Sequence, residues 1–189
     1  MNTPSHLVLN LAALGRNRGT RLGWFIAIGA VLPDVPLFGF YVYERLWVGA
    51  PEPTIWGELY FRPAWQALFD TVHSIPLVLF ALLVASWLRR PGAALLCASM
   101  LLHDLCDLPL HTVDAHRHFY PLSDYRFVSP VSYWDPRAHG AAGALVELIA
   151  VMAASVLLAR RTASRAARGA LLGLNALSGC GYVLFYWTR

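Results

Sequence analysis

The chain has 189 residues, of which 57% are hydrophobic and only 14% charged, with a formal net charge of +4 at pH 7. This composition is more apolar than that of a soluble domain and favours an integral membrane protein. The 15 basic side chains are all arginine. They lie in short groups rather than in one groove-like patch, which argues against nucleic-acid binding. The length suits a single membrane-embedded domain over 1–189.

The first 21 residues predict a short helix and a basic turn. The segment 3–14 has a helical pattern, with Pro4 where a first helical turn tolerates proline. Thr3 can cap this helix from the preceding position. The helix is too short to cross a bilayer. We therefore expect the turn at 15–20 to fold it back against the next helix.

Five apolar segments follow, and each is close to the ~20 residues that a helix needs to cross a bilayer. They are 22–42, 72–88, 92–110, 141–159 and 169–187. The sequence therefore predicts an all-α, polytopic transmembrane bundle of about five spans plus the N-terminal half-helix. Three spans with ligand-type residues occupy 22–110, an outer loop 111–140, and two C-terminal spans 141–189.

The arginines predict the orientation of this bundle. Nine of them lie in three stretches: before the first span, between the second and third spans, and between the fourth and fifth spans. No acidic residue lies in these stretches, so the positive-inside rule assigns them to the cytoplasm. We expect a bacterial inner membrane protein in contact with membrane lipid. The long connections 44–71 and 111–140 then lie on the outer face.

The third span carries the densest group of metal-ligand residues. His103, Asp107 and His111 recur every four residues and share one helical face. Ionisable side chains inside a span are costly and mark functional sites. A histidine with an aspartate one turn later suits zinc. The alternative is a polar helix face packed against a polar neighbour.

Two more candidates lie at an interruption of the first span and at the start of the second. Asp34 lies between Pro33 and Pro36, and irregular backbone at this depth occurs only inside protein or beside a cavity. His73 opens the second span, and Asp70 is placed to orient its ring. The alternatives are a kink in which Asp34 bonds freed backbone groups, and an interfacial histidine.

Heights along the helices suggest that these groups meet in one layer. A helix rises ~1.5 Å per residue, so distances can be counted from the arginine-rich end. The count places His6, Asp34, His73, His103, Asp107 and Glu147 in the outer half of the membrane. Asp34 and Glu147 are the candidate proton acceptors, although Glu147 suits a plain hydrogen-bonded role equally well.

The outer loop holds histidines and arginines at high density. His118 and His139 are candidates for a second metal site. Arg117 and Arg126 can each grip a phosphate through two nitrogens. The alternative is an amphipathic interfacial loop with paired surface charges.

Several of these motifs resemble a known family. His6, Gly29 with Pro33-Asp34, His73-Ser74 and His103 with Asp107 resemble the membrane-bound metal-dependent hydrolases of the LexA-regulated inner-membrane type. Their order also resembles bacterial zinc-dependent phospholipase C. The resemblance implies one zinc held by Asp34, His73, His103 and Asp107. It implies a neighbouring ion at His6, and another at His118 or His139 with Glu147.

The chain departs from these patterns at three points. Pro36 stands where the hydrolases often have a second aspartate, and Phe69-Asp70 stands where they often have His-Arg. His139 and Glu147 are eight positions apart, whereas the phospholipase has four. The resemblance therefore supports the first metal position better than the others.

Three functions follow as hypotheses. The first is a zinc-dependent hydrolase of a lipid-like phosphoester, in which a metal-activated water attacks the substrate. The second is a small ion- or proton-coupled transporter, since intramembrane His and Asp also build ion sites. Five spans without an internal repeat argue against it. The third is a membrane scaffold with a structural metal.

Overall fold

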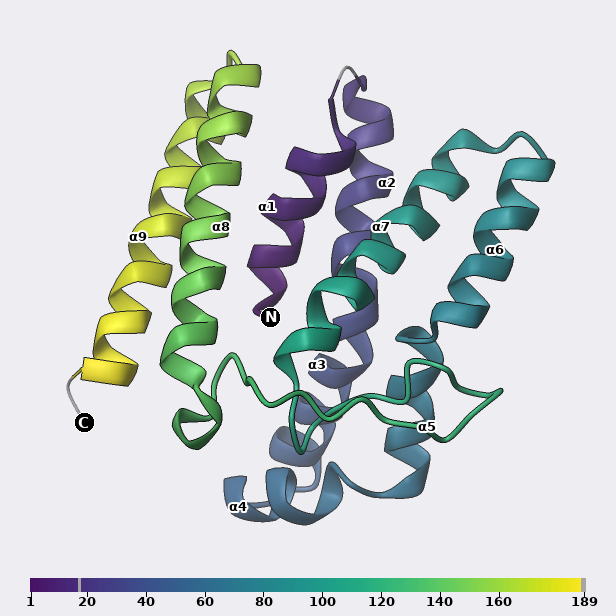
Figure 1. Ribbon diagram of the computed structural model, residues 1–189, viewed down its shortest axis with the longest axis vertical. Coiled ribbons are helices and arrows are strands. Elements are labelled where there is room, and N and C mark those ends of the chain that lie inside the picture. Colours follow the sequence, from purple (N-terminus) through teal and green to yellow (C-terminus); the bar gives the residue numbers. More distant parts are fainter. Residues whose placement is uncertain (17, 188–189) are drawn as a thin grey trace.

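The computed structural model describes residues 1–16 and 18–187, and it is an all-α helical bundle (Figure 1). No strand occurs in this described part of the chain. Five helical stretches are long and apolar enough to cross a membrane, namely Thr20–Trp47, Pro63–Trp87, Pro91–Leu110, Gly140–Arg161 and Arg165–Trp187. The predicted fold class and the five spans are confirmed.

The first span is broken at its two prolines. It consists of α2 (Thr20–Val31), the 3₁₀ turn η1 (Leu32–Asp34), α3 (Val35–Val42) and the wider turn η2 (Tyr43–Trp47). Pro33 and Pro36 cannot donate backbone hydrogen bonds, which favours a local change of helix type. The break therefore lies where the sequence predicted it, and Asp34 is its last residue.

The second span is also broken, at His73-Ser74. It consists of α5 (Pro63–Val72) and α6 (Ile75–Trp87). The Ser74 hydroxyl accepts a bond from the Leu77 amide at 3.3 Å, which is a helix N-cap. Pro76 follows in the first turn of α6, where proline is tolerated. A single continuous helix is thus prevented by local sequence.

The connection 44–71 is helical and not the loop that the sequence led us to expect. It contains η2, α4 (Glu52–Thr54), η3 (Ile55–Leu59) and most of α5. Phe40, Ile55, Tyr60 and Phe69 form a buried core here. Aromatic packing of this kind stabilises short helices that would be marginal alone.

The N-terminal half-helix α1 (Thr3–Leu14) is confirmed and lies inside the bundle. It packs between α8 (Gly140–Arg161) on one side and α2 and α7 (Pro91–Asp107) on the other (Figure 1). Val8 packs against Val151 and Ala154 of α8. The Asn10 side chain donates to the Ser99 carbonyl of α7 at 2.8 Å. This helix therefore brings polar side chains into the centre of the bundle.

Helices α2 and α7 approach closely at Gly29. A Cβ atom at this position would lie 2.3 Å from the Leu96 carbonyl oxygen. Small residues allow such close approach of membrane helices. The Ser99 hydroxyl donates to the Ile26 carbonyl at 2.7 Å across the same contact. The approach fixes α7 beside the break at Asp34.

Helix α8 and α9 (Arg165–Trp187) form a continuous hairpin at one side of the bundle (Figure 1). The chain between α7 and α8 starts with the 3₁₀ turn η4 (Leu108–Leu110) and ends with η5 (Pro136–Ala138). In Figure 1 this connection runs below the C-terminal end of α7 and past the break between α5 and α6. Its backbone anchors there, because the Ile75 amide donates to the His118 carbonyl at 2.9 Å.

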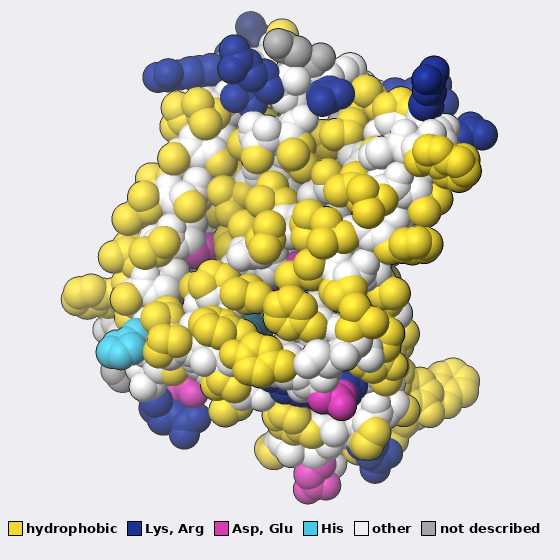
Figure 2. Space-filling view, turned by 45° about the vertical axis from the view of Figure 1, so that its right-hand side comes forward, with side chains coloured by type: hydrophobic (Ala, Val, Ile, Leu, Met, Phe, Trp, Pro, Cys, Tyr) yellow, Lys and Arg dark blue, Asp and Glu magenta, His cyan; other side chains and the backbone are white. Residues whose placement is uncertain are grey.

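Charge is distributed unevenly along the bundle. Figure 2 shows arginine side chains gathered at the end that holds the α1–α2, α6–α7 and α8–α9 turns. Hydrophobic side chains cover most of the face below them, and the opposite end carries both acidic and arginine side chains. This arrangement fits the charge asymmetry that the sequence predicted.

Candidate metal centre

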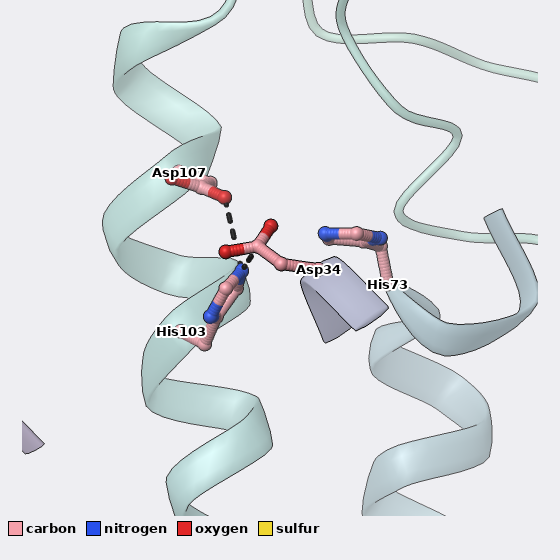
Figure 3. A group of neighbouring side chains, drawn as sticks. All are labelled: Asp34, His73, His103 and Asp107. Atoms are coloured by element: carbon pink, nitrogen blue, oxygen red, sulfur yellow. Dashed lines mark ion pairs between the residues drawn. The ribbon is translucent and has the colours of Figure 1, made fainter. Parts of the chain in front are cut away.

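Four of the predicted ligands converge at the centre of the bundle. Asp34, His73, His103 and Asp107 each offer a ligand atom, and these atoms all lie within 4.8 Å of one another (Figure 3). They come from η1, the end of α5 and α7. Counting residues along each helix gave only the heights of these side chains. The structure shows that the four side chains also lie close together across the bundle.

His103 is held in one orientation by a backbone carbonyl. Its Nδ1 lies 2.8 Å from the Ala30 carbonyl oxygen. A carbonyl can only accept, so Nδ1 carries the proton and Nε2 is left with its lone pair. This Nε2 lies 3.2 Å from an Asp107 oxygen and 3.7 Å from an Asp34 oxygen. Fixing the tautomer from behind is how proteins prepare a histidine to bind metal.

His73 is oriented in the same way. Its Nδ1 lies 2.9 Å from the Phe69 carbonyl oxygen, which again directs the Nε2 lone pair forward. The prediction that Asp70 orients this ring is wrong. Asp70 instead accepts bonds from the Arg117 amide at 2.9 Å and the Arg117 Nε at 2.5 Å. The acceptor that orients the His73 ring is instead the backbone carbonyl of Phe69, four residues earlier in α5.

Asp34 is positioned by the first residue of α1. The Thr3 hydroxyl donates to Asp34 Oδ2 at 2.5 Å, and the other oxygen, Oδ1, faces His103. The expectation that Thr3 caps α1 is wrong, because Asn2 occupies the N-cap position. α1 therefore helps to orient a carboxylate across the bundle.

The four residues could hold a divalent metal ion. The Nε2 atoms of His73 and His103 are buried and have no hydrogen-bond partner in the described part of the chain. Unpaired buried polar atoms are costly, so two of them that face two carboxylates favour a site that binds a cation.

Asp107 faces a second group of nitrogens with its other oxygen. His6 Nε2 lies 3.0 Å and His111 Nε2 lies 3.5 Å from Asp107 Oδ1. The Met1 nitrogen contacts the same oxygen. The His6 ring is stacked on His103, with centroids 3.6 Å apart. Asp107 thus contacts nitrogens on two sides, and the predicted ligands His6 and His111 lie beside its Oδ1, outside the four-residue cluster.

His116 is a buried histidine that the sequence analysis did not select. Its ring is stacked on His73 with centroids 4.0 Å apart, and it lies 6.1 Å from the His118 ring. Burial lowers the pKa of His116 well below its ordinary value, and the His73 and His111 rings lower it further. Burial lowers the pKa of His118 as well. Neutral rings of this kind can bind metal. The signal available in the sequence was the His116-x-His118 pair.

His111 differs from these two rings in its charge. Burial opposes its charged form, but Asp107 and Asp114 outweigh that effect and raise the pKa of His111 to about 9. Its Nδ1 lies 2.9 Å from Asp114 Oδ2. The raised pKa favours the charged form of His111, which lies beside Asp107 together with the Met1 ammonium.

The predicted phosphate-binding arginines have protein partners. Arg117 Nε donates to Asp70 at 2.5 Å, and its NH1 donates to Asp124 at 2.6 Å. Arg126 donates to the Ala115 carbonyl at 2.7 Å and to the Gln66 side chain at 3.0 Å. Both arginines brace the loop. A phosphate would have to compete with these partners.

The remaining candidates lie outside the four-residue cluster. Glu147 is buried in α8, where its Oε1 accepts bonds from Asn2 and Ser5 at the start of α1. His139 is exposed at the N-terminus of α8, whereas the other six histidines are buried. The part of the chain that the structure describes shows no ring contact or ion pair between His139 and those six. Asp104 is fully buried on α7, and its carboxylate lacks a hydrogen-bond partner among the described residues.

Comparisons of the chain with protein-family models, with curated proteins and with solved structures found no match. Any functional assignment therefore depends on the geometry of the site.

Proposed function

We propose that the protein is a zinc-dependent hydrolase that acts at the membrane on a lipid-like phosphoester. The observation that carries the proposal is the pair of buried, unpartnered Nε2 atoms of His73 and His103, which face two carboxylates. Two imidazoles and two carboxylates form a donor set that zinc binds well. The resemblance of these motifs to membrane-bound metal-dependent hydrolases supports the same assignment.

The chemistry of the site would follow from this donor set. A bound zinc ion lowers the pKa of a coordinated water toward neutrality and so supplies a nucleophile. His73, His103 and Asp107 would hold the ion and leave a fourth position for water. The Phe69 and Ala30 carbonyls keep the two rings from turning. Asp34 is the carboxylate that we assign as proton acceptor, because its Oδ1 faces the cluster while Oδ2 is held by Thr3. The alternative acceptor, Glu147, is tied to α1 by its Oε1.

The substrate class is proposed from the surroundings of the site. The cluster lies within membrane-spanning helices, so substrates that partition into lipid reach it most readily. A divalent ion also stabilises the charge that develops on phosphoryl oxygens. Arg117 and Arg126 lie on the adjoining loop and are the proposed phosphate contacts.

The experiment that tests the proposal combines metal analysis with a hydrolysis assay. Purified protein in detergent should contain zinc and release a phosphorylated head group or an alcohol from lipid-like phosphoesters. Chelation should abolish the release, and added zinc should restore it. A zinc-loaded protein that hydrolyses none of a broad phosphoester and ester panel would contradict the proposal. Metal- or proton-coupled flux in liposomes would then favour the transporter, and neither activity would favour a structural metal.

Substitution of Arg117 tests the proposed substrate contact. Arg117→Ala should keep its zinc but raise KM, because an anion-binding arginine acts outside the metal ligands. Arg137→Ala is the matched control on the same loop, since Arg137 is exposed and pairs only locally with Asp135. An unchanged KM in Arg117→Ala would show that Arg117 only braces the loop.

We also propose that the protein lies in a bacterial inner membrane with the arginine-rich turns in the cytoplasm. Cysteines introduced one at a time at Ala163 and Ala138 test this orientation in a background with Cys106→Ser and Cys180→Ser, because Cys106 is half-buried and Cys180 is exposed, whereas Cys97 is buried. An impermeant thiol reagent added from outside should label position 138 and leave position 163 unlabelled. Labelling of position 163 but not of position 138 would show that the bundle has the opposite orientation.

A further inference from the structure

The turn between α6 and α7 holds an open cavity of about 360 Å³ at the arginine-rich end of the bundle (Figures 1 and 2). The last turn of α6 and the first turn of α7 line it, together with Arg89 and Arg90 between them. A cavity of about 540 Å³ between α1, α8 and α9 borders Glu147 and has no basic residue in its lining. Of these two, the α6–α7 cavity is the one suited to a negatively charged ligand.

The side chains of Arg89 and Arg90 are available to such a ligand. Both are exposed, and neither side chain makes a hydrogen bond or an ion pair within the described part of the chain. Arg117 on the outer loop differs, because its guanidinium pairs with Asp70 and Asp124. The α6–α7 cavity is thus left with two uncompensated positive charges. A guanidinium group binds a phosphate through two parallel hydrogen bonds.

The N-terminus of α7 adds to this positive potential. The helix is 17 residues long, and no side chain caps it, because Arg90 occupies the N-cap position. The first amides of an uncapped helix lack partners, and the helix dipole places a partial positive charge at this end. Pro91 and Ala94 of this first part of α7 line the cavity. An anion beside the two arginines would therefore also meet the favourable end of a helix.

Arg89 occupies a backbone position that usually holds glycine. Its amide donates to the Ser86 carbonyl at 3.0 Å. The Arg90 amide donates to the Ala85 carbonyl at 2.9 Å, which completes a Schellman turn at the end of α6. Arg89 has a φ of 52°, in the left-handed region, where a side chain costs free energy that glycine would not. The chain therefore carries an arginine where the turn itself favours glycine.

The cavity lies at the depth of lipid head groups. Trp87 is 82% exposed and closely precedes the turn, and a tryptophan at the end of a span marks the membrane interface. Both flanking helices belong to candidate spans. The phosphates concentrated at this depth belong to lipids. Arg90 lies ~20 Å from His103 along α7, so this cavity is separate from the metal cluster.

We propose that the α6–α7 cavity binds the phosphate of an anionic phospholipid whose head group carries no cation, such as phosphatidylglycerol. The phosphate oxygens accept hydrogen bonds from Arg89, Arg90 and the first amides of α7. Basic pockets between membrane helices bind head groups of this kind. A choline head group would bring a positive charge toward two arginines, which disfavours phosphatidylcholine. The site does not depend on the proposed hydrolysis, which would take place at the metal cluster.

The test is native mass spectrometry of the full chain in detergent, titrated with dioleoylphosphatidylglycerol or with dioleoylphosphatidylcholine. Metal is first removed by chelation, so that hydrolysis cannot consume the lipid. We expect the first phosphatidylglycerol to bind at least about tenfold more tightly than phosphatidylcholine, because each arginine contact contributes about fivefold. Equal affinities for the two lipids would overturn the proposal.

Two variants with the same change in net charge separate a site from general surface charge. Arg90→Ala should weaken binding of phosphatidylglycerol about fivefold, because it removes one phosphate contact. Arg160→Ala should bind as the wild type does, since Arg160 is exposed near the α8–α9 turn and does not line the cavity. Equal losses in the two variants would overturn the site, because the preference would then come from the charge of the whole end.

Arg89→Gly distinguishes a ligand contact from a structural role. Glycine suits the left-handed position, so this variant should have a higher Tm than the wild type in detergent without added lipid. Its affinity for phosphatidylglycerol should nevertheless fall about fivefold. A disturbed turn would lower both quantities together. A lower Tm, or an unchanged affinity, would overturn the assignment of Arg89.

Competition with glycerol 3-phosphate decides the source of the phosphate. This compound carries the phosphate without acyl chains. It should not displace phosphatidylglycerol at equal concentration, because the lipid is also held by its chains beside the flanking helices. Displacement at equal concentration would assign the cavity to a soluble phosphate and overturn the lipid as its ligand.

Discussion

The two broken spans and the continuous α8–α9 hairpin differ in the polar groups that they bury. Asp34 and His73 lie at the breaks of the first and second spans, and both belong to the metal cluster. The described residues of α9 include no buried side chain, and α8 supplies one buried carboxylate, Glu147. The candidate metal cluster therefore combines residues at the two breaks with His103 and Asp107 of α7, and the hairpin contributes none of its four residues.

The difference shows how a helix break prepares a ligand. Ala30 and Phe69 lie within one turn of a break, and each carbonyl accepts the Nδ1 proton of a histidine in the cluster. The Phe69 carbonyl also accepts the His73 amide at 3.1 Å. The unbroken hairpin offers no such acceptor to the cluster. Irregular backbone thus orients the rings as well as holding Asp34.

The largest expected effect comes from removing a ligand that α7 presents to the two breaks. His103→Ala and Asp107→Ala should each lose nearly all bound zinc and all metal-dependent hydrolysis, because each loses a ligand atom. Asn175→Ala is the matched control on the hairpin, where Asn175 donates to Ser155 at 2.8 Å. Elemental analysis of the purified proteins gives the readout. Full zinc content in His103→Ala would remove the basis for the site.

A smaller effect is expected from disturbing the contact that places α7 beside the first break. Gly29→Ala should destabilise the protein by roughly 1–3 kcal/mol, because its Cβ would collide with the Leu96 carbonyl. Gly23→Ala on the same helix meets nothing within 4 Å and should be neutral or slightly stabilising.

Thermal unfolding in detergent, with zinc content measured in parallel, checks this prediction. Loss of zinc in Gly29→Ala but not in Gly23→Ala would tie the cluster to the α2–α7 approach. Equal stability of the two variants would show that this approach is not needed.

The smallest expected effect comes from weakening the second break. Ser74→Ala should cost about 1 kcal/mol, because it removes the N-cap of α6. It also removes a bond to the Tyr120 carbonyl of the loop. Ser86→Ala, at the exposed other end of α6, is the control. A Ser74→Ala protein as stable as the control would mean that Pro76 alone sets the break.

The sequence predicted much of this site because its signals are local. Helical spacing placed His103 and Asp107 on one face, and prolines marked the break at Asp34. The failures arose from contacts between distant segments. Asp70 precedes His73 in the chain but bonds Arg117 in the loop, and His116 comes to the site through the ring stacking on His73.

The sequence by itself determined the all-α class, the five apolar spans, the charge asymmetry and the candidate ligands. These follow from composition and helical periodicity, which act within a few turns of chain. Only the tertiary structure decided which ligands meet, that Asp107 faces two groups of nitrogens, and that Glu147 borders a cavity rather than the four-residue cluster. Those outcomes depend on lateral packing, above all on α1 lying between α8 and α7, and spacing along one helix carries no information about its neighbours.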